Sequence, residues 1–321
     1  MRPSILSLLL WVGPPVEPEV VEVVPVPPPE RTLDPSVVEE EDPIPVTLPQ
    51  AEAETRHAAA PPNLHVHWEV DLPLMLGSTA VWLGTELFRE RLVPASPRWT
   101  KASTGDLALR DALTWRSPAT ARHLSDVLAA GVVPLFGLTL TLADIGRSRQ
   151  WRVLHEDLVV VAEAVTVAGM LTQALKLSTA RGRPYTYEVY DGSSNADVDH
   201  LLVYEADAFT SFPSAHASVA FAFASSFATV ATLRRRKLAP YLWGFGMPLA
   251  GFTAYLRVAA HRHWFSDVVI GSTLGSIVGA GLPILLHHPE FGLLSRLTAR
   301  KRRLDVRVIP SASGATVVGR F

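Results

Sequence analysis

After residue 62, long hydrophobic segments of the chain alternate with short polar segments. Uncharged or nearly uncharged runs of about twenty residues are separated by short charged segments. A helix of about twenty residues crosses the hydrocarbon core of a bilayer. Six runs fit or approach that length: 72–88, 124–143, 158–175, 217–233, 238–256 and 268–286.

This pattern predicts an all-α fold, a membrane-embedded bundle of about six helices. The last run also places Gly271, Gly275 and Gly279 at four-residue spacing. Small residues at this spacing allow membrane helices to approach one another closely. A large soluble bundle of buried helices is the alternative, and runs this long without charge favour the membrane bundle.

The two ends of the chain differ from this middle part. Half of the chain's 26 prolines lie in 13–62, among Glu and Val, which predicts a disordered Pro/Glu-rich tail. The first residues, MRPSILSLLLWVG, have a short apolar run that fits either a signal segment or a disordered start. We therefore divide the chain into 1–62, a helical domain at 63–290, and a basic tail at 291–321. In that tail the segment LDVRVIPSASGATVVGRF alternates apolar and polar residues around a Ser-Gly turn, which predicts a short β-hairpin.

Composition excludes some functions. The chain of 321 residues has a net charge of −2, so it lacks the basic field that would indicate a nucleic-acid partner. It has no cysteine, which excludes disulfides and thiolate chemistry. The mean hydropathy of +0.21 is high for a soluble protein.

Basic segments indicate a topology. GRSRQWR, RRRK and RLTARKRRLDVR follow the second, fourth and sixth runs, so the three segments lie on the same side. The positive-inside rule makes that side cytoplasmic. The basic first loop, 89–122, opposes this assignment, and an N-terminus on the inside does not fit a cleaved signal. The segments after the third and fifth runs then meet at the non-cytoplasmic face.

Those two outward segments carry cations and a helix start. Lys176, Arg183 and Arg257 are three cations, and Ser214 stands where the fourth run begins. Arginine gives forked donors to phosphate, and lysine gives a point charge. The unpaired N–H groups at a helix start also favour an anion. Together these residues predict a pocket for a phosphate ester.

Two histidines and a carboxylate complete the predicted chemistry. One imidazole can attack phosphorus to form a phosphohistidine, while the other protonates the leaving group and then activates water. Asp267 lies four residues after His263, on the same face of a helix. We therefore predict His263 as the nucleophile, Asp267 as its partner and His216 as the acid.

Three motifs resemble those of the type 2 phosphatidic acid phosphatase (PAP2) superfamily, which includes lipid phosphatases, bacterial acid phosphatases and vanadium haloperoxidases. KLSTARGRP fits K-x6-R-P, PSAH fits P-S-G-H, and LRVAAHRHWFSD fits S-R-x5-H-x3-D. Ala215 replaces the usual glycine and keeps its backbone N–H. Leu256 replaces a serine, which removes a hydroxyl contact. The resemblance covers about 72–286.

The resemblance implies a six-helix bundle in membrane members, chemistry that needs no metal or cofactor, and a role for each motif residue. His263 is the nucleophile, His216 the acid and Asp267 the partner of His263. The phosphate-binding residues are Lys176, Arg183, Ser214, Ala215 and Arg257.

These observations predict a metal-independent phosphatase of phosphate monoesters or pyrophosphates, with lipids as substrates. We expect it in a bacterial-type inner membrane, with its site on the non-cytoplasmic side. Three alternatives remain: a vanadium-dependent haloperoxidase, in which His263 would hold vanadate, a soluble periplasmic acid phosphatase, and a catalytically dead membrane scaffold. The sequence names neither the leaving group nor a protein partner.

Overall fold

A computed structural model describes residues 62, 64–187, 207–293 and 296, and two strands at 305–311 and 314–320. The predicted signal segment and all but the last residue of the Pro/Glu-rich tail lie outside the described residues. The loop 188–206, between two of the motifs, also lies outside them.

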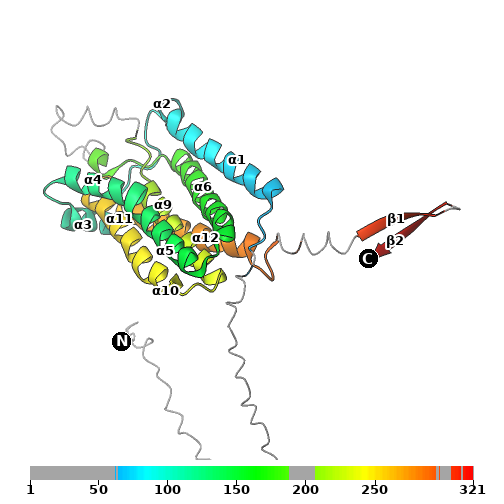
Figure 1. The fold of residues 1–321 in the computed structure, drawn as a ribbon. Coiled ribbons are helices and arrows are strands. Elements are labelled where there is room, and N and C mark those ends of the chain that lie inside the picture. Colours follow the sequence, from blue (N-terminus) through cyan, green and yellow to red (C-terminus); the bar gives the residue numbers. More distant parts are fainter. Residues whose placement is uncertain are drawn as a thin grey trace, which may run out of the picture. The chain divides into compact units, whose positions relative to one another are not determined.

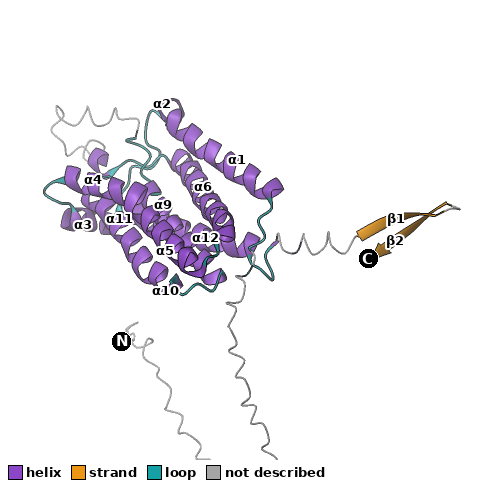
Figure 2. Cartoon of the chain, in the orientation of Figure 1, coloured by secondary structure: helices purple, strands orange, loops and turns teal. Residues whose placement is uncertain are grey.

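Helices make up the described part of the chain up to residue 293 (Figures 1 and 2). The longest single helices are α1 (Trp68–Leu87), α6 (Leu154–Thr179), α9 (Ala215–Leu233) and α12 (Phe265–His287). Two longer helical runs contain a π-helical turn, a local widening of the helix. The first joins α4 (Pro118–Val127), η2 (Leu128–Val132) and α5 (Val133–Ser148). The second joins α10 (Ala239–Tyr241), η5 (Leu242–Gly246) and α11 (Met247–Ala259). The short elements are α2 (Arg89–Leu92), α3 (Thr104–Leu113), η3 (Trp151–Val153) and η4 (Pro184–Thr186).

Each of the six predicted runs coincides with one of these helices, so the all-helical bundle is confirmed. Four helices are long and apolar enough to cross a membrane: Pro118–Ser148, Trp151–Thr179, Ala215–Leu233 and Phe265–His287. The helix α1 and the run from α10 to α11 are not among these four in the described part of the chain.

The core lies along α9. Most of its residues are buried, and its alanines and Phe227 pack with valines of α6. The glycines of α12 allow the closest contact. A Cβ on Gly275 would lie 2.1 Å from the carbonyl oxygen of Ser218, and one on Gly271 would lie 2.5 Å from that of Ser214. The predicted close approach is therefore confirmed, and it fixes the start of α9 against the start of α12.

Ion pairs connect α6 with the segment that follows α9, at the end of the bundle opposite the starts of α9 and α12. Arg234, directly after α9, donates to Asp157 of α6 at 2.9 Å and also pairs with Glu156. Arg236 pairs with the same Asp157. Two arginines of the RRRK segment are therefore buried structural residues rather than solvated loop charges. Lys237, the last residue of that segment, is exposed.

The predicted C-terminal hairpin is present. Strands β1 (Asp305–Ser311) and β2 (Gly314–Arg320) pair in antiparallel register, from Asp305 opposite Arg320 to Ser311 opposite Gly314. Its alternating sequence gives each strand two faces with a period of two residues.

Candidate active site

The three motif segments meet at one end of the bundle. Lys176 lies in the last turn of α6, and Arg183 lies in the loop that follows. The start of α9 touches the start of α12, since the Ser214 N–H donates to the Asp267 carbonyl at 3.0 Å. The Arg183 guanidinium donates to the Arg262 carbonyl at 2.7 Å. These two contacts bring together residues that are 53 and 79 positions apart in the sequence.

Three predicted phosphate-binding cations are buried there. Lys176, Arg183 and Arg257 are 5%, 2% and 4% exposed. The two arginines are held by carboxylates: Arg183 Nη2 lies 2.6 Å from Asp207, and Arg257 Nη1 lies 3.0 Å from Asp126. Arg257 Nε is buried without a hydrogen-bond partner among the described residues. Buried cations in excess of their partners favour a bound anion.

His263 lies in the turn between α11 and α12 and is 2% exposed. Its Nδ1 lies 2.7 Å from the carbonyl oxygen of Ser211. A carbonyl only accepts, so Nδ1 carries the proton and Nε2 has the free lone pair. That Nε2 lies 3.2 Å from Nη1 of Arg183. The nitrogen that carries the lone pair therefore faces one of the arginines predicted to bind phosphate.

The electrostatic field keeps His263 neutral. Burial lowers the pKa of His263 well below its usual value, and the charges of Arg183, Arg257, Lys176 and His216 lower it further. A neutral imidazole is the form that can act as a nucleophile.

Asp267 is near His263 but does not bond to it directly. Its Oδ2 lies 3.7 Å from His263 Nδ1, beyond a hydrogen bond. The same oxygen accepts from Ser211 Oγ at 2.5 Å and from the Trp264 N–H at 2.9 Å. Asp267 thus holds the serine whose carbonyl orients His263, where the spacing alone predicted direct contact.

Arg181 belongs to this support and not to a solvated loop. It is 1% exposed and lies between Asp106, at 2.8 Å, and Asp267, at 2.5 Å. Its guanidinium stacks 4.0 Å from the ring centre of Trp99. Asp106, near the start of α3, also accepts from the Ser266 N–H at 2.9 Å. Burial alone would raise the pKa of Asp106, but the bonds from Ser266 and Arg181 outweigh burial and lower it.

Asp126 is a site residue that the motifs do not contain. One of its oxygens lies 2.8 Å from His216 Nε2 and 3.0 Å from Arg257 Nη1. Ser125 Oγ also accepts from Arg257 Nη1, at 2.8 Å. The sequence carried one signal for it, a carboxylate near the start of an apolar run, where a charge is costly without a function.

Asp207 is a second such residue, and it pairs with Arg183. Burial would raise the pKa of Asp207, but Arg183, Lys176 and a hydrogen bond from Thr210 hold it well below its ordinary value. The Thr210 hydroxyl donates to Asp207 at 2.8 Å. A carboxylate that stays ionised holds the Arg183 guanidinium in position. No signal in the sequence distinguished Asp207 from its neighbours.

The start of α9 has the geometry that its sequence predicted. Ser214 is the N-cap, fully buried, and its Oγ accepts from the Ala217 N–H at 3.5 Å. Ala215 begins the helix, in a position that an alanine adopts without strain. The backbone N–H groups in the first turn of α9 lie at the positive end of the helix dipole.

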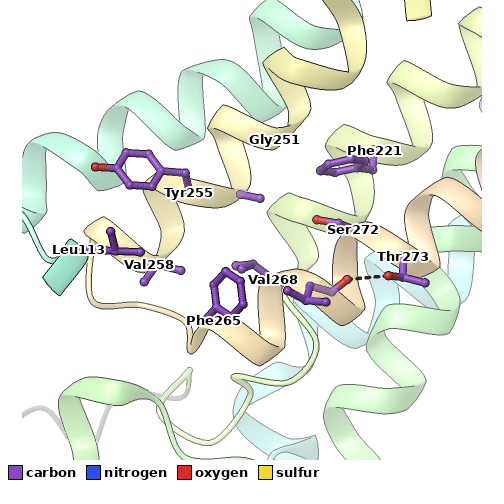
Figure 3. A pocket seen from close by; sticks show the side chains of 11 residues that line it. Leu113, Phe221, Gly251, Tyr255, Val258, Phe265, Val268, Ser272 and Thr273 are labelled. Carbon is purple, nitrogen blue, oxygen red and sulfur yellow. Dashed lines mark hydrogen bonds between the residues drawn. The ribbon is translucent and has the colours of Figure 1, made fainter. Parts of the chain in front are cut away.

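An apolar groove lies between α9, α11 and α12 (Figure 3). It has a volume of about 340 Å³. Phe221 of α9, Tyr255 and Val258 of α11, and Phe265 and Val268 of α12 line it. Val258, Phe265 and Val268 are sequence neighbours of Arg257, Trp264 and Asp267. The groove therefore leads along the flank of the bundle from the end that holds the cations.

Comparisons with known proteins agree with the motifs. Residues 157–288 match the family model of the PAP2 superfamily. The lipid A 1-phosphatase of Porphyromonas gingivalis is 29% identical over 180 residues, which is 54% of this chain and 34% of that protein. The chain therefore aligns with about a third of the length of this curated relative.

One solved structure is also similar. The crystal structure of Aquifex aeolicus LpxE is 22% identical, and the match covers 57% of this chain and 96% of that one at a TM-score of 0.39. A TM-score this low is too weak a likeness to support a shared fold. The family match contains all the motif residues from Lys176 to Asp267. Over residues 157–288, the chain is therefore similar to the PAP2 superfamily.

Proposed function

We propose that this chain is a metal-independent phosphatase that removes phosphate from a lipid through a phosphohistidine on His263. One observation carries the proposal: a buried neutral imidazole, with its lone pair on Nε2, faces Arg183 among three buried cations. These cations match the charge that spreads over the equatorial oxygens of a transferring phosphoryl group.

The reaction has two steps. In the first, His263 Nε2 attacks phosphorus, the bond to the leaving oxygen breaks, and His216 gives that oxygen a proton. In the second, His216 takes a proton from water, the water oxygen attacks phosphorus, and the P–N bond breaks with its electron pair returning to Nε2. The products are the dephosphorylated lipid and inorganic phosphate.

The supporting residues keep the two histidines in these roles. The Ser211 carbonyl holds the His263 proton on Nδ1, and Asp267 holds Ser211. Asp126 faces His216 Nε2, which orients the ring and leaves Nδ1 as the nitrogen that exchanges the proton with the leaving group. Lys176, Arg183, Arg257 and the first N–H groups of α9 hold the phosphate.

A lipid substrate fits the surroundings of the site. Four helices are long and apolar enough to cross a membrane, and the groove beside the site is lined by apolar side chains. A lipid could keep its tails along such a groove while its head group reaches the cations. The curated relative is a lipid A 1-phosphatase, so lipid A joins phosphatidate, phosphatidylglycerophosphate and isoprenyl pyrophosphate as a candidate substrate. We place the site on the non-cytoplasmic side of a bacterial-type inner membrane.

Phosphate release from this panel tests the proposal. The purified chain is assayed in detergent with excess EDTA, next to His263→Asn and the matched control His288→Gln. We expect release by the native chain and by the control, inhibition by vanadate, and a loss of at least a thousand-fold in His263→Asn. Release that His263→Asn retains, or no release from any lipid in the panel, would contradict the mechanism.

A further inference from the structure

A second group of ionisable side chains lies inside the bundle, away from the phosphate pocket. Asp71 of α1, Glu163 of α6 and His287 of α12 are each 0% exposed. One possible ligand atom from each lies within 4.8 Å of those of the other two. We call these three residues the buried triad. At 1.5 Å per residue, His287 lies about 30 Å along α12 from Asp267.

The polar atoms of the buried triad are only partly satisfied. His287 Nε2 lies 2.8 Å from Glu163 Oε2, which is a hydrogen bond between α12 and α6. Asp71 Oδ2 accepts from the His67 N–H at 2.6 Å. One further atom on each side chain is buried and has no hydrogen-bond partner among the described residues: Asp71 Oδ1, Glu163 Oε1 and His287 Nδ1. Buried polar atoms without a partner are costly, so three of them in one group point to a missing ligand.

The charge of the buried triad also indicates a missing ligand. Among the described residues, neither carboxylate forms an ion pair with a lysine or an arginine, and the pair of Glu163 is with His287. Buried carboxylates are normally paired or bound to a metal. This end of the bundle does have arginines, but Arg234 and Arg236 are bound to Asp157 and its neighbour.

We infer that the buried triad binds a divalent transition-metal ion of the zinc or manganese class. One imidazole and two carboxylates are a donor set that these ions accept, whereas calcium and magnesium prefer oxygen alone. The ion would take the place of the missing hydrogen-bond partners and neutralise the two carboxylates.

The role of this ion is structural. Its ligands come from three helices, and α1 runs beside α6 (Figure 1). The ion would therefore fasten the first part of α1 to α6 and to the end of α12. It lies too far from His263 to take part in phosphate chemistry, so a phosphatase that works in EDTA is compatible with it.

Metal binding to the full chain, without a histidine tag, is the test. The protein is stripped with a strong chelator in detergent and then supplied with Zn²⁺ or Mn²⁺ alone. Bound metal per chain is measured by mass spectrometry after desalting, and the thermal midpoint is measured with and without metal. We expect one ion per chain and a midpoint that rises with free metal concentration, because an ion that binds only the folded state stabilises it.

Two near-isosteric variants and a control make the result specific. Glu163→Gln keeps the contact with His287, and Asp71→Asn keeps the acceptor for the His67 N–H, so both can fold. Each should bind the ion at least ten-fold more weakly, while His288→Gln should bind as the native chain does. Absence of stoichiometric metal, or equal binding by native chain and both variants, would overturn the inference. Protons would then be the charge that balances the carboxylates.

Discussion

At the scale of single residues, Asp126 joins two motifs that are far apart in the sequence. It lies 2.8 Å from the imidazole of His216 and 3.0 Å from the guanidinium of Arg257. It belongs to α4, which carries none of the motifs. We regard it as a positioning residue, because in the proposed mechanism its effect on the leaving group passes through His216.

Asp126→Asn should slow proton delivery to the leaving group. We expect kcat for an alkyl phosphate lipid to fall by about ten- to a hundred-fold, the range that a weakened general acid produces. The rate with p-nitrophenyl phosphate, whose leaving group needs no proton, should fall much less. Steady-state kinetics with both substrates measure the difference, and Asp111→Asn is the control, since Asp111 is an exposed carboxylate outside the site. An equal fall for both substrates would indicate a merely structural effect.

The buried state of His263 also makes stability depend on pH. Its pKa in the folded chain is well below the unfolded value of about 6.5, so the unfolded chain binds more protons below that pH. The contribution of neutral His263 to the free energy of unfolding is therefore fully present above about pH 6.5, and it is lost as the pH falls. Between pH 7.5 and 5.5 we expect His263 to account for about 1.4 kcal/mol of lost unfolding free energy.

Unfolding of the native chain and of His263→Asn at both pH values measures this contribution. The native chain should lose about 1.4 kcal/mol more than the variant over this interval. His261, whose pKa burial lowers to about 4, contributes to both proteins and cancels in the difference. Equal losses would mean that His263 is charged in the folded chain.

At the scale of elements, the contact of α9 with α12 sets the geometry of the site. The glycines at four-residue spacing let the two backbones touch. At the end of that contact the Ser214 N–H donates a hydrogen bond to the backbone carbonyl of Asp267. The sequence predicted that these glycines serve close packing. It did not show that α9 was the partner, because any neighbouring helix satisfies the same pattern.

Gly275→Ala should separate these helices. Its new Cβ would lie 2.1 Å from the Ser218 carbonyl, a backbone atom that cannot move alone. We expect a loss of about 1–3 kcal/mol in stability and a lower kcat, since the start of α9 shifts with the helix. Thermal unfolding in detergent and phosphate release measure the two effects.

Gly281→Ala on the same helix is the matched control. A Cβ there meets no atom within 4 Å, so stability should stay the same or rise by up to about 1 kcal/mol through helix propensity. If both variants behaved alike, backbone entropy rather than close packing would explain the glycines.

At the scale of the whole molecule, the bundle has two chemically different ends. One holds the buried cations and the histidines, and the other holds the pairs of Arg234 and Arg236 with α6. The basic RRRK segment supported a cytoplasmic position for the second end. Because two of its arginines are buried in ion pairs, that support now rests on fewer solvated charges.

The absence of cysteine permits a direct test of orientation. Lys101→Cys marks the site end and Lys237→Cys marks the other end, and both lysines are exposed. In intact cells, a membrane-impermeant maleimide should label position 101 and should reach position 237 only after lysis. The reverse labelling would place the active site on the cytoplasmic side.

Sequence patterns were enough to predict the helices, the resemblance to the PAP2 superfamily and most residues of the candidate site. Apolar runs of membrane length and the three motifs are local patterns, and a local pattern can be read without knowing its neighbours. The C-terminal hairpin was predictable for the same reason.

The groups that support these residues became known from the packing of the helices. Asp126, Asp207 and Asp106 act on motif residues that lie far along the chain or on other helices, and such contacts depend on how the helices pack. The same holds for Ser211, whose carbonyl takes the place predicted for Asp267 because the turn after α11 brings His263 Nδ1 closer to it. The buried triad also comes from three separate helices, so no spacing in the sequence could reveal it.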